Sequence, residues 1–279
     1  MALVTMKELL TMAEKNDIAT GAFSVGNMEM VMGAVVAAEE LNTPIILQIA
    51  EVRLKNSPLE LMGPMMLAAA KNAKVDIAVH LDHGLNIETV QKALDLGFTS
   101  VMFDGSLLSL EDNISSVKEV VRRASKYGAT VEAELGVVGG NEGEGTAHEI
   151  KCTSPDDAKI FCDETGIDAL AVAIGNAHGN YPVAPQLRLD VLDDIHKKVS
   201  TPLVLHGGTG ISDEQFRQAI KLGIRKVNIA TASFDKLAEY AKIYCDSTEK
   251  ANYFELSSRQ AEGVYENVKR HIKIFSFID

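Results

Sequence analysis

Three histidines in this sequence are placed where they could hold one metal ion together. His83, His178 and His206 each close a short apolar, β-rich run and lie beside a glycine or an aspartate. A lone histidine in such a place is more often a hydrogen-bonded structural residue, but three in the same setting favour ligation. Three neutral imidazoles with an open fourth position are typical of a catalytic zinc site. We therefore expect these residues to bind Zn²⁺.

The other histidines have weaker claims to such a role. His80 lies two residues before Asp82 on the same strand face, so a structural role is equally plausible and it is not counted as a ligand. His148, His196 and His271 stand in polar loop or helix contexts. We predict that these three lie on the surface.

Two carboxylates end apolar runs in the same manner as the histidines. Asp104 follows the run 101–103, and Glu134 closes the run 131–134, which also contains Glu132. We expect both to be chemically active, and a carboxylate beside a zinc site can orient a metal ligand by hydrogen bonding. Glu132 is interpreted as a structural or supporting residue.

The elements that must position these side chains alternate along the chain. Eight apolar, strand-like runs are each followed by an amphipathic stretch, several of which open with Asn, Ser or Asp and close with glycine. The expected strands are 22–25, 44–49, 76–82, 100–104, 130–134, 169–174, 202–205 and 226–229. The expected helices between them are 27–41, 59–72, 87–96, 113–127, 155–165, 189–199 and 213–222.

This alternation predicts a TIM, or (β/α)8, barrel formed by residues 1–279 as a single domain. Active residues of such barrels lie at the carboxyl ends of the strands, where every polar residue named above falls. A doubly wound sheet is the alternative, but its single switch point fits five functional strand ends poorly. Extra helices are expected at 6–16, 232–247 and 259–274. The last two could cover the barrel or a neighbouring subunit, and we expect a homo-oligomer, either a dimer or a tetramer.

Composition limits the classes of partner. The chain has 279 residues, is 46% hydrophobic and carries a formal charge of −12. This charge argues against a nucleic-acid or anionic-membrane surface, because neutralising phosphates requires clustered Lys and Arg. Three cysteines without CxxC spacing indicate a reducing compartment. No apolar run approaches the roughly 18 to 20 residues of a membrane span, and no secretory signal is visible, so we expect a cytoplasmic protein.

A glycine-rich turn suggests a phosphate site. His206-Gly207-Gly208-Thr209-Gly210 follows the seventh expected strand and opens a helix, and 228–231 ends the eighth strand. Backbone N–H groups at such turns bind phosphate whatever the net charge of the protein. These are also the two loops in which barrel enzymes most often hold phosphate. A small phosphorylated ligand is therefore expected.

Two longer segments carry a resemblance to a known family. Residues 80–84 (HLDHG) and 131–142 (VEAELGVVGGNE) resemble the signature motifs of class II, metal-dependent ketose-bisphosphate aldolases of the fructose- and tagatose-bisphosphate type. Segments 173–179 and 205–210 extend the resemblance, which weakens only near the C-terminus.

The resemblance implies reversible cleavage of a ketose 1-phosphate or 1,6-bisphosphate, between C3 and C4, into dihydroxyacetone phosphate and an aldehyde. A divalent metal stabilises the enediolate that this reaction requires. His83, His178 and His206 match the zinc ligands. Asp82 matches the residue that exchanges a proton with the C4 oxygen. Glu142, in a loop with four glycines in seven residues, matches the base at C3, and Glu144 is a nearby competitor.

Further positions match the ligand sites of the family. Asp104 and Glu134 match positions that hold a second divalent metal in some members. A monovalent cation, Na⁺ or K⁺, often assists at the phosphate site. The contacts to dihydroxyacetone phosphate are matched by Gly179, Gly207, Gly208, Thr209, Asn228, Ile229, Ala230 and Thr231.

Departures from the fructose-bisphosphate pattern bear on the substrate. Pro182 stands where those members carry a phosphate-binding lysine, and Ala50 stands where many carry a serine that touches substrate. Glu51 would disfavour a second phosphate nearby, whereas Arg53 would compensate for it. We therefore expect a tagatose-type or related substrate, with fructose 1,6-bisphosphate as the alternative.

Two rival functions come from other classes. A non-catalytic partner subunit of an aldolase would lack metal ligands, so the three histidines, Asp82 and Glu142 argue against it. A phosphosugar isomerase or epimerase would share the enediolate but would not cleave a carbon–carbon bond. The metal-free alternative for an aldolase is Schiff-base chemistry, which needs a lysine at an active strand end, and Lys226 is expected at the wrong end of its strand.

Overall fold

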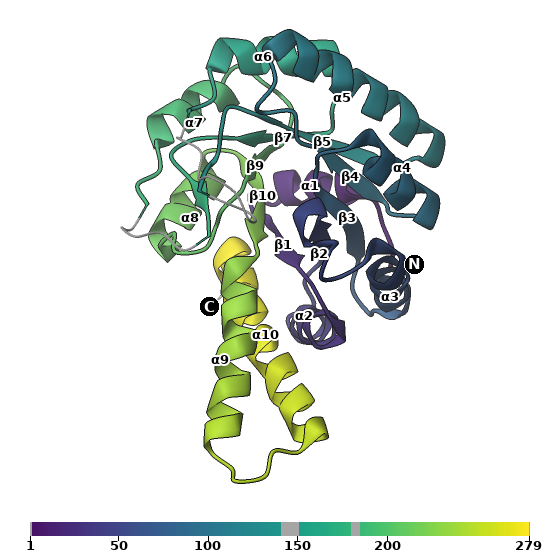
Figure 1. Cartoon of the computed structure of the whole chain (residues 1–279). Coiled ribbons are helices and arrows are strands. Elements are labelled where there is room, and N and C mark those ends of the chain that lie inside the picture. The colour runs from purple at the N-terminus through teal and green to yellow at the C-terminus, as the bar shows by residue number, and fades with distance from the viewer. Residues whose placement is uncertain (1, 141–150, 180–184, 279) are drawn as a thin grey trace.

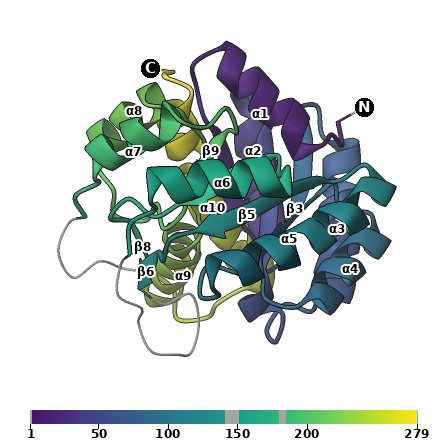
Figure 2. The ribbon, with the colours of Figure 1, turned by 90° about the horizontal axis from the view of Figure 1, so that it is seen from above.

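The computed structural model describes residues 2–140, 151–179 and 185–278. Eight parallel strands form a closed barrel in the order β1-β10-β9-β7-β5-β4-β3-β2, with helices around it (Figures 1 and 2). The predicted (β/α)8 barrel is therefore confirmed. The barrel strands are β1 (Thr20–Ser24), β2 (Ile45–Ala50), β3 (Ile77–Gly84), β4 (Ser100–Phe103), β5 (Thr130–Leu135), β7 (Ala169–Val172), β9 (Leu203–Leu205) and β10 (Ile224–Ile229).

The helices of the described residues follow the predicted alternation closely. They are α1 (Met6–Lys15), α2 (Met28–Glu40), α3 (Leu59–Asn72), α4 (Ile87–Leu96), α5 (Leu110–Ala124), α6 (Pro155–Thr165), α7 (Leu189–His196), α8 (Asp213–Lys221), α9 (Thr231–Asp246) and α10 (Tyr253–Phe275). Short 3-10 turns η1 (Glu51–Arg53) and η2 (Ser125–Tyr127) and a two-stranded pair, β6 (Gly139–Gly140) with β8 (Ala177–His178), were not predicted.

Two apolar clusters hold the barrel together. The larger cluster fills the layer between the strands and the surrounding helices. The smaller lies inside the barrel, where Met6, Leu9 and Leu10 of α1 pack against inward-facing residues of the strands. Val4 N–H donates to the Ile77 carbonyl and Ile77 N–H donates to the Ala2 carbonyl, which brings the start of the chain to the amino ends of the strands. Helix α1 therefore closes this end of the barrel and leaves the carboxyl ends for chemistry.

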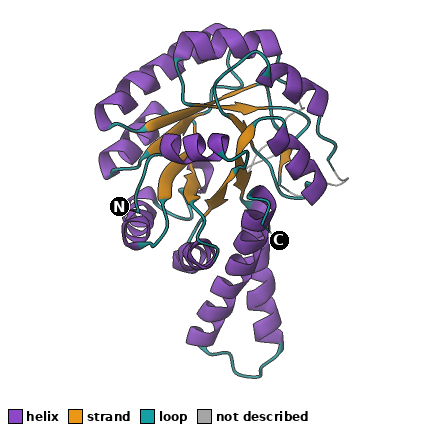
Figure 3. Cartoon of the chain, turned by 180° about the vertical axis from the view of Figure 1, so that it is seen from behind, coloured by secondary structure: helices purple, strands orange, loops and turns teal. Residues whose placement is uncertain are grey.

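The last two helices form an antiparallel hairpin that projects from the barrel (Figures 1 and 3). Helix α10 packs against both α2 and α9. The close approach requires glycine, because a Cβ at Gly33 of α2 would lie 2.5 Å from the Ala261 carbonyl oxygen, and one at Gly263 would lie 2.5 Å from that of Lys236. No helix of the described chain is long and apolar enough to cross a membrane.

One histidine prediction was wrong. His271 lies in α10 with only 3% of its surface exposed, and its Nδ1 donates a hydrogen bond to the Asn267 carbonyl at 2.8 Å. Its ring packs edge-on against Phe216. The polar neighbours of His271 in sequence lie on the outer side of the helix, which is why the local composition misled. His196 is exposed, as predicted, and His148 lies outside the described residues.

Candidate metal and substrate site

The site begins at an irregularity in β3. Successive side chains of a strand normally point to opposite faces. The pairing of β3 with β4 shifts register between Leu81 and Gly84, and His83 adopts a φ of 40°. This bulge lets both Asp82 and His83 reach the mouth of the barrel. Only glycine fits at position 84, because a Cβ there would lie 2.5 Å from the Met102 carbonyl oxygen.

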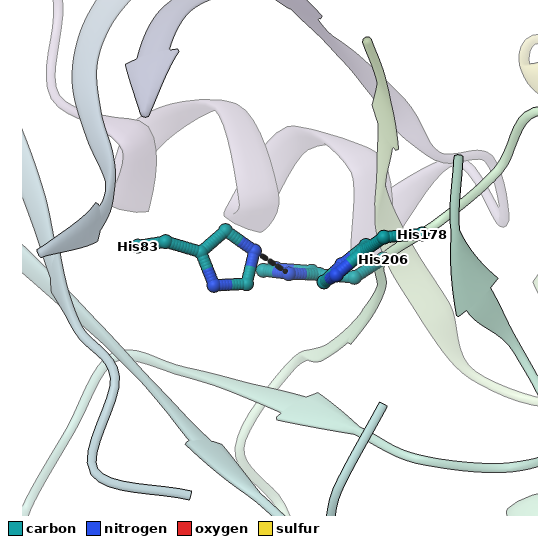
Figure 4. Close-up of side chains that lie close together, drawn as sticks. All are labelled: His83, His178 and His206. Carbon is teal, nitrogen blue, oxygen red and sulfur yellow. Dashed lines mark hydrogen bonds between the residues drawn. The ribbon is translucent and has the colours of Figure 1, made fainter. Parts of the chain in front are cut away.

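The three predicted histidines converge at this mouth (Figure 4). They come from β3, from β8 and from the turn after β9. One ring nitrogen from each lies within 4.8 Å of the others. His83 Nε2 and His206 Nδ1 are 2.8 Å apart, and the ring of His178 is centred 4.9 Å from that of His83. The structure therefore brings together the three histidines that were grouped from the ends of apolar runs in the sequence.

The chemistry of this donor set fits a divalent metal such as Zn²⁺. His206 Nε2–H donates to Glu132 Oε1 at 2.8 Å, and His83 Nδ1–H donates to Asp104 Oδ2 at 2.8 Å. With these carboxylates accepting from the outer nitrogens, the inner nitrogens of both rings, 2.8 Å apart, are the ones that would bind a metal. Burial, followed by the nearby His83, lowers the pKa values of His178 and His206 well below the usual range, which favours the neutral, ligating form.

A second cluster shares one of these histidines. His83, Asp104 and Glu134 also place ligand atoms within 4.8 Å of one another. Burial alone would raise the pKa of the Asp104 carboxyl, but hydrogen bonds from His83 and Ser106 hold it below its usual range. Asp104 is therefore an anion that orients His83 and that also has the position of a metal ligand.

Asp82 is held by two amides. It is 2% exposed, its Oδ1 accepts from Asn228 Nδ2 at 3.0 Å, and its Oδ2 accepts from Gln48 Nε2 at 2.9 Å. Burial raises the pKa of the Asp82 carboxyl above its usual value. A carboxyl with a raised pKa, fixed at a cavity wall, can donate a proton as well as accept one.

Beside Asp82 lies a cavity floored by glycine turns. Gly207 has a φ of 63°, and a Cβ there would collide with the Ala177 carbonyl, so only glycine fits. Helix α9 begins at Thr231, and its N-terminal N–H groups add a positive partial charge at this cavity. The cavity is lined by most of the predicted phosphate residues: Gly179, Gly207, Gly208, Thr209, Asn228, Ala230 and Thr231. The predicted Ile229 is not among them, because its side chain is fully buried in the larger apolar cluster.

The cavity continues toward η1. Ala50 and Arg53 line it, and the Arg53 guanidinium carbon lies 5.6 Å from the centre of the Phe234 ring. Glu51, which would repel an anion there, is engaged elsewhere. Its carboxylate accepts from Leu85 N–H at 2.6 Å and from Thr89 Oγ1 at 2.8 Å. Arg53 is therefore the cationic side chain that η1 contributes to the cavity.

Several members of the site were not anticipated from sequence. Gln48 and Ser24 line the cavity, and Gln48 Nε2 lies 3.2 Å from Ser24 Oγ. The sequence did contain a signal for Gln48, because a glutamine inside the apolar, buried strand IILQIA requires polar partners. The predicted base Glu142, its competitor Glu144, and Pro182 lie outside the described residues.

The comparisons with known proteins agree on one family, and the matches extend over nearly the whole chain. The sequence profile of the class II fructose-bisphosphate aldolases matches residues 4–279. A sulfofructosephosphate aldolase of Alkalicoccus urumqiensis is 38% identical over 99% of this chain and 97% of its own. A 6-phospho-5-dehydro-2-deoxy-D-gluconate aldolase of Halalkalibacterium halodurans is 37% identical over 99% and 96%.

A solved structure agrees with these matches. The YdjI aldolase of Escherichia coli K12 superimposes with a TM-score of 0.87 at 36% identity, covering 98% of this chain and 97% of its own. Fold, sequence and the convergence of three histidines at the carboxyl ends of the strands thus coincide. The chain belongs to the class II fructose-bisphosphate aldolase family and is a carbon–carbon lyase.

Proposed function

We propose that the protein reversibly cleaves a ketose 1-phosphate into dihydroxyacetone phosphate and an aldehyde. The observation that carries the proposal is the meeting of three histidines with Asp82 and the glycine-lined cavity. His83, His178 and His206 would hold Zn²⁺, which when bound supplies a Lewis acid that stabilises negative charge on the ketone oxygen. Glu132 and Asp104 fix the tautomers of His206 and His83.

Asp82 would exchange the proton of the C4 oxygen. In cleavage it accepts the proton of the C4 hydroxyl as the C3–C4 bond breaks, and in condensation it returns a proton to the aldehyde oxygen. Its raised pKa suits both directions, and the amides of Asn228 and Gln48 hold both carboxylate oxygens in place. Glu142 stays the predicted base at C3, on sequence grounds.

The phosphate would lie on the turn from Gly207 to Thr209, facing the first turn of α9. Backbone N–H groups supply this site, and a Na⁺ or K⁺ ion is proposed to assist there. A second divalent ion is proposed at Asp104 and Glu134, which share His83 with the first site. The assembly is proposed to be a homo-oligomer.

The far end of the substrate is proposed to carry a second anion, which meets Arg53. The support is the position of Arg53 in the cavity and the engagement of Glu51 with the loop after β3. The names of both relatives point the same way, since one substrate carries a sulfo group and the other is a gluconate, each with a phosphate. We favour a tagatose-type or related sugar, and fructose 1,6-bisphosphate is the second candidate because the family is named for it.

A condensation panel tests this function. Dihydroxyacetone phosphate would be offered to the zinc-loaded protein with matched aldehydes that end in phosphate, sulfonate, carboxylate or a neutral hydroxyl. Anionic aldehydes should condense faster, and Arg53→Gln should reduce that preference about tenfold or more, because a charge-assisted hydrogen bond is lost. Product configuration at C3 and C4 separates tagatose-type from fructose-type chemistry. No condensation with any aldehyde would refute the proposal.

A further inference from the structure

Lys226 is a charged side chain buried in the middle of the barrel. It belongs to β10 and has no exposed surface. Its ammonium group lies 2.8 Å from Glu132 Oε2 and 2.7 Å from Asn228 Oδ1. A charge removed from water in this way is tolerated only when it is paired and hydrogen-bonded. The ion pair also excludes a free amine for Schiff-base chemistry.

The ammonium dictates which way the Asn228 amide faces. Lysine has three donors and no acceptor, so the atom of Asn228 that meets it must be the oxygen. The Asn228 nitrogen then points the other way and donates to Asp82 Oδ1 at 3.0 Å. The flipped amide would set two donors face to face at Lys226 and two acceptors face to face at Asp82. Lys226 thus selects the orientation that supports Asp82.

The position of these side chains follows from strand geometry. Lys226 and Asn228 are two residues apart on β10, so they share its inner face. Glu132 comes from β5, which β9 and β7 separate from β10 in the barrel. Its carboxylate accepts from Lys226 with one oxygen and from His206 Nε2 with the other. One ammonium therefore links the Asp82 carboxyl to the support of a predicted metal ligand.

We infer that Lys226 is a positioning residue for the reaction, acting through Asn228 on the carboxylate of Asp82 without touching substrate. The kinetic consequences of this inference rest on the proposed function. The orientation of the Asn228 amide does not depend on that function. Loss of the ammonium should let the amide rotate. Asp82 would then lose one of its two amide donors, and proton exchange at the C4 oxygen would slow.

The test compares two variants. Lys226→Met alone leaves Glu132 buried without a counter-charge and could fail to fold, so the informative variant is Lys226→Met combined with Glu132→Gln. Its reference is Glu132→Gln alone, which keeps the ammonium beside Asn228 but without its counter-charge, so the wild type serves as a second reference. The first readout is the side-chain amide resonance of Asn228, assigned by its loss in Asn228→Asp. The buried amide of Asn267, which donates to Ser233 Oγ at 3.0 Å in another part of the fold, is the internal control.

The expected outcome is a shifted Asn228 resonance and an unshifted Asn267 resonance in the double variant. Its kcat for cleavage should fall about 10- to 100-fold below that of Glu132→Gln. The amount of bound zinc should differ less than about threefold between the double variant and Glu132→Gln. The same holds for the rate at which the C3 hydrogen of dihydroxyacetone phosphate exchanges with solvent deuterium, because neither metal binding nor this exchange uses Asp82 in this scheme.

Other outcomes overturn the inference. An Asn228 resonance identical in the two variants shows that Lys226 does not set the amide. Cleavage and exchange that fall by the same factor show that Lys226 acts on the metal site or the fold and not on Asp82. If the wild-type protein neither cleaves ketose phosphates nor exchanges the C3 hydrogen, the proposed function fails, and the amide resonance alone then decides the role of Lys226.

Discussion

Asp82 and His83 are consecutive residues of one strand, yet both reach the same end of the barrel. The shifted pairing of β3 with β4 and the positive φ of His83 break the alternation that would otherwise send one of them outward. A proton-exchanging carboxyl thus lies one residue from a predicted metal ligand. Their separation is fixed by a single backbone conformation and not by the packing of two elements.

Replacing Asp82 should stop cleavage and spare metal binding. Asp82→Asn removes the proton acceptor while it keeps the size of the side chain, so kcat should fall about 10²- to 10⁴-fold, the usual contribution of general acid–base catalysis. Zinc content, measured by elemental analysis, should equal that of the wild type because Asp82 belongs to neither metal cluster. Asp76→Asn, at the exposed residue just before β3, is the matched control. Near wild-type cleavage by Asp82→Asn would rule out its assigned role.

Metal removal should abolish activity and reduce stability. Chelation leaves the inner nitrogens of His83 and His206 facing each other at 2.8 Å, and re-addition of zinc or cobalt should restore turnover. A ligand at 100 times its Kd stabilises the native state by about 2.7 kcal/mol, so the apo protein should melt at a lower temperature. His178→Ala should behave like the chelated wild type. Full activity after thorough chelation would disprove the metal assignment.

Much of this arrangement was predictable because a parallel barrel gathers the carboxyl ends of its strands. His83, His178 and His206 could be grouped without coordinates, since each ends an apolar run. The link between Lys226 and Glu132 could not be predicted, because it joins two strands, β10 and β5, that are not neighbours in the barrel. The bulge at His83 was equally hidden, since no residue pattern separates an irregular strand end from a regular one. His271 was missed because tertiary burial overrode its polar surroundings.

The second cluster predicts a metal stoichiometry. If a second divalent ion binds there, zinc should titrate to two per chain in the wild type and to one in Glu134→Gln, since that change removes a carboxylate ligand of the second cluster alone. Asp104→Asn should also weaken the first site, by about 10- to 100-fold, because Asp104 orients His83 at 2.8 Å. Calorimetric titration of the apo protein measures both. A single zinc per chain in the wild type would leave Asp104 with an orienting role only.

His271 should make the fold sensitive to acid. Burial lowers its pKa from 6.5 to about 4, so between these values the unfolded chain binds a proton that the folded chain does not. The contribution to stability is therefore fully present above pH 6.5 and is lost as the pH falls toward 4. The two pKa values differ by about 2.5 units, which corresponds to a stability change of about 3 to 4 kcal/mol.

His271→Gln should remove this acid sensitivity. In urea unfolding of the chelated protein, followed by circular dichroism at pH 7, 6, 5 and 4, the wild type should lose more stability than the variant over that range, because glutamine does not titrate. Chelation removes the contribution of bound metal, and exposed His196, changed to Gln, is the matched control and should follow the wild-type curve. Parallel curves for the wild type and His271→Gln would show that the buried ring is not what makes the fold acid-sensitive.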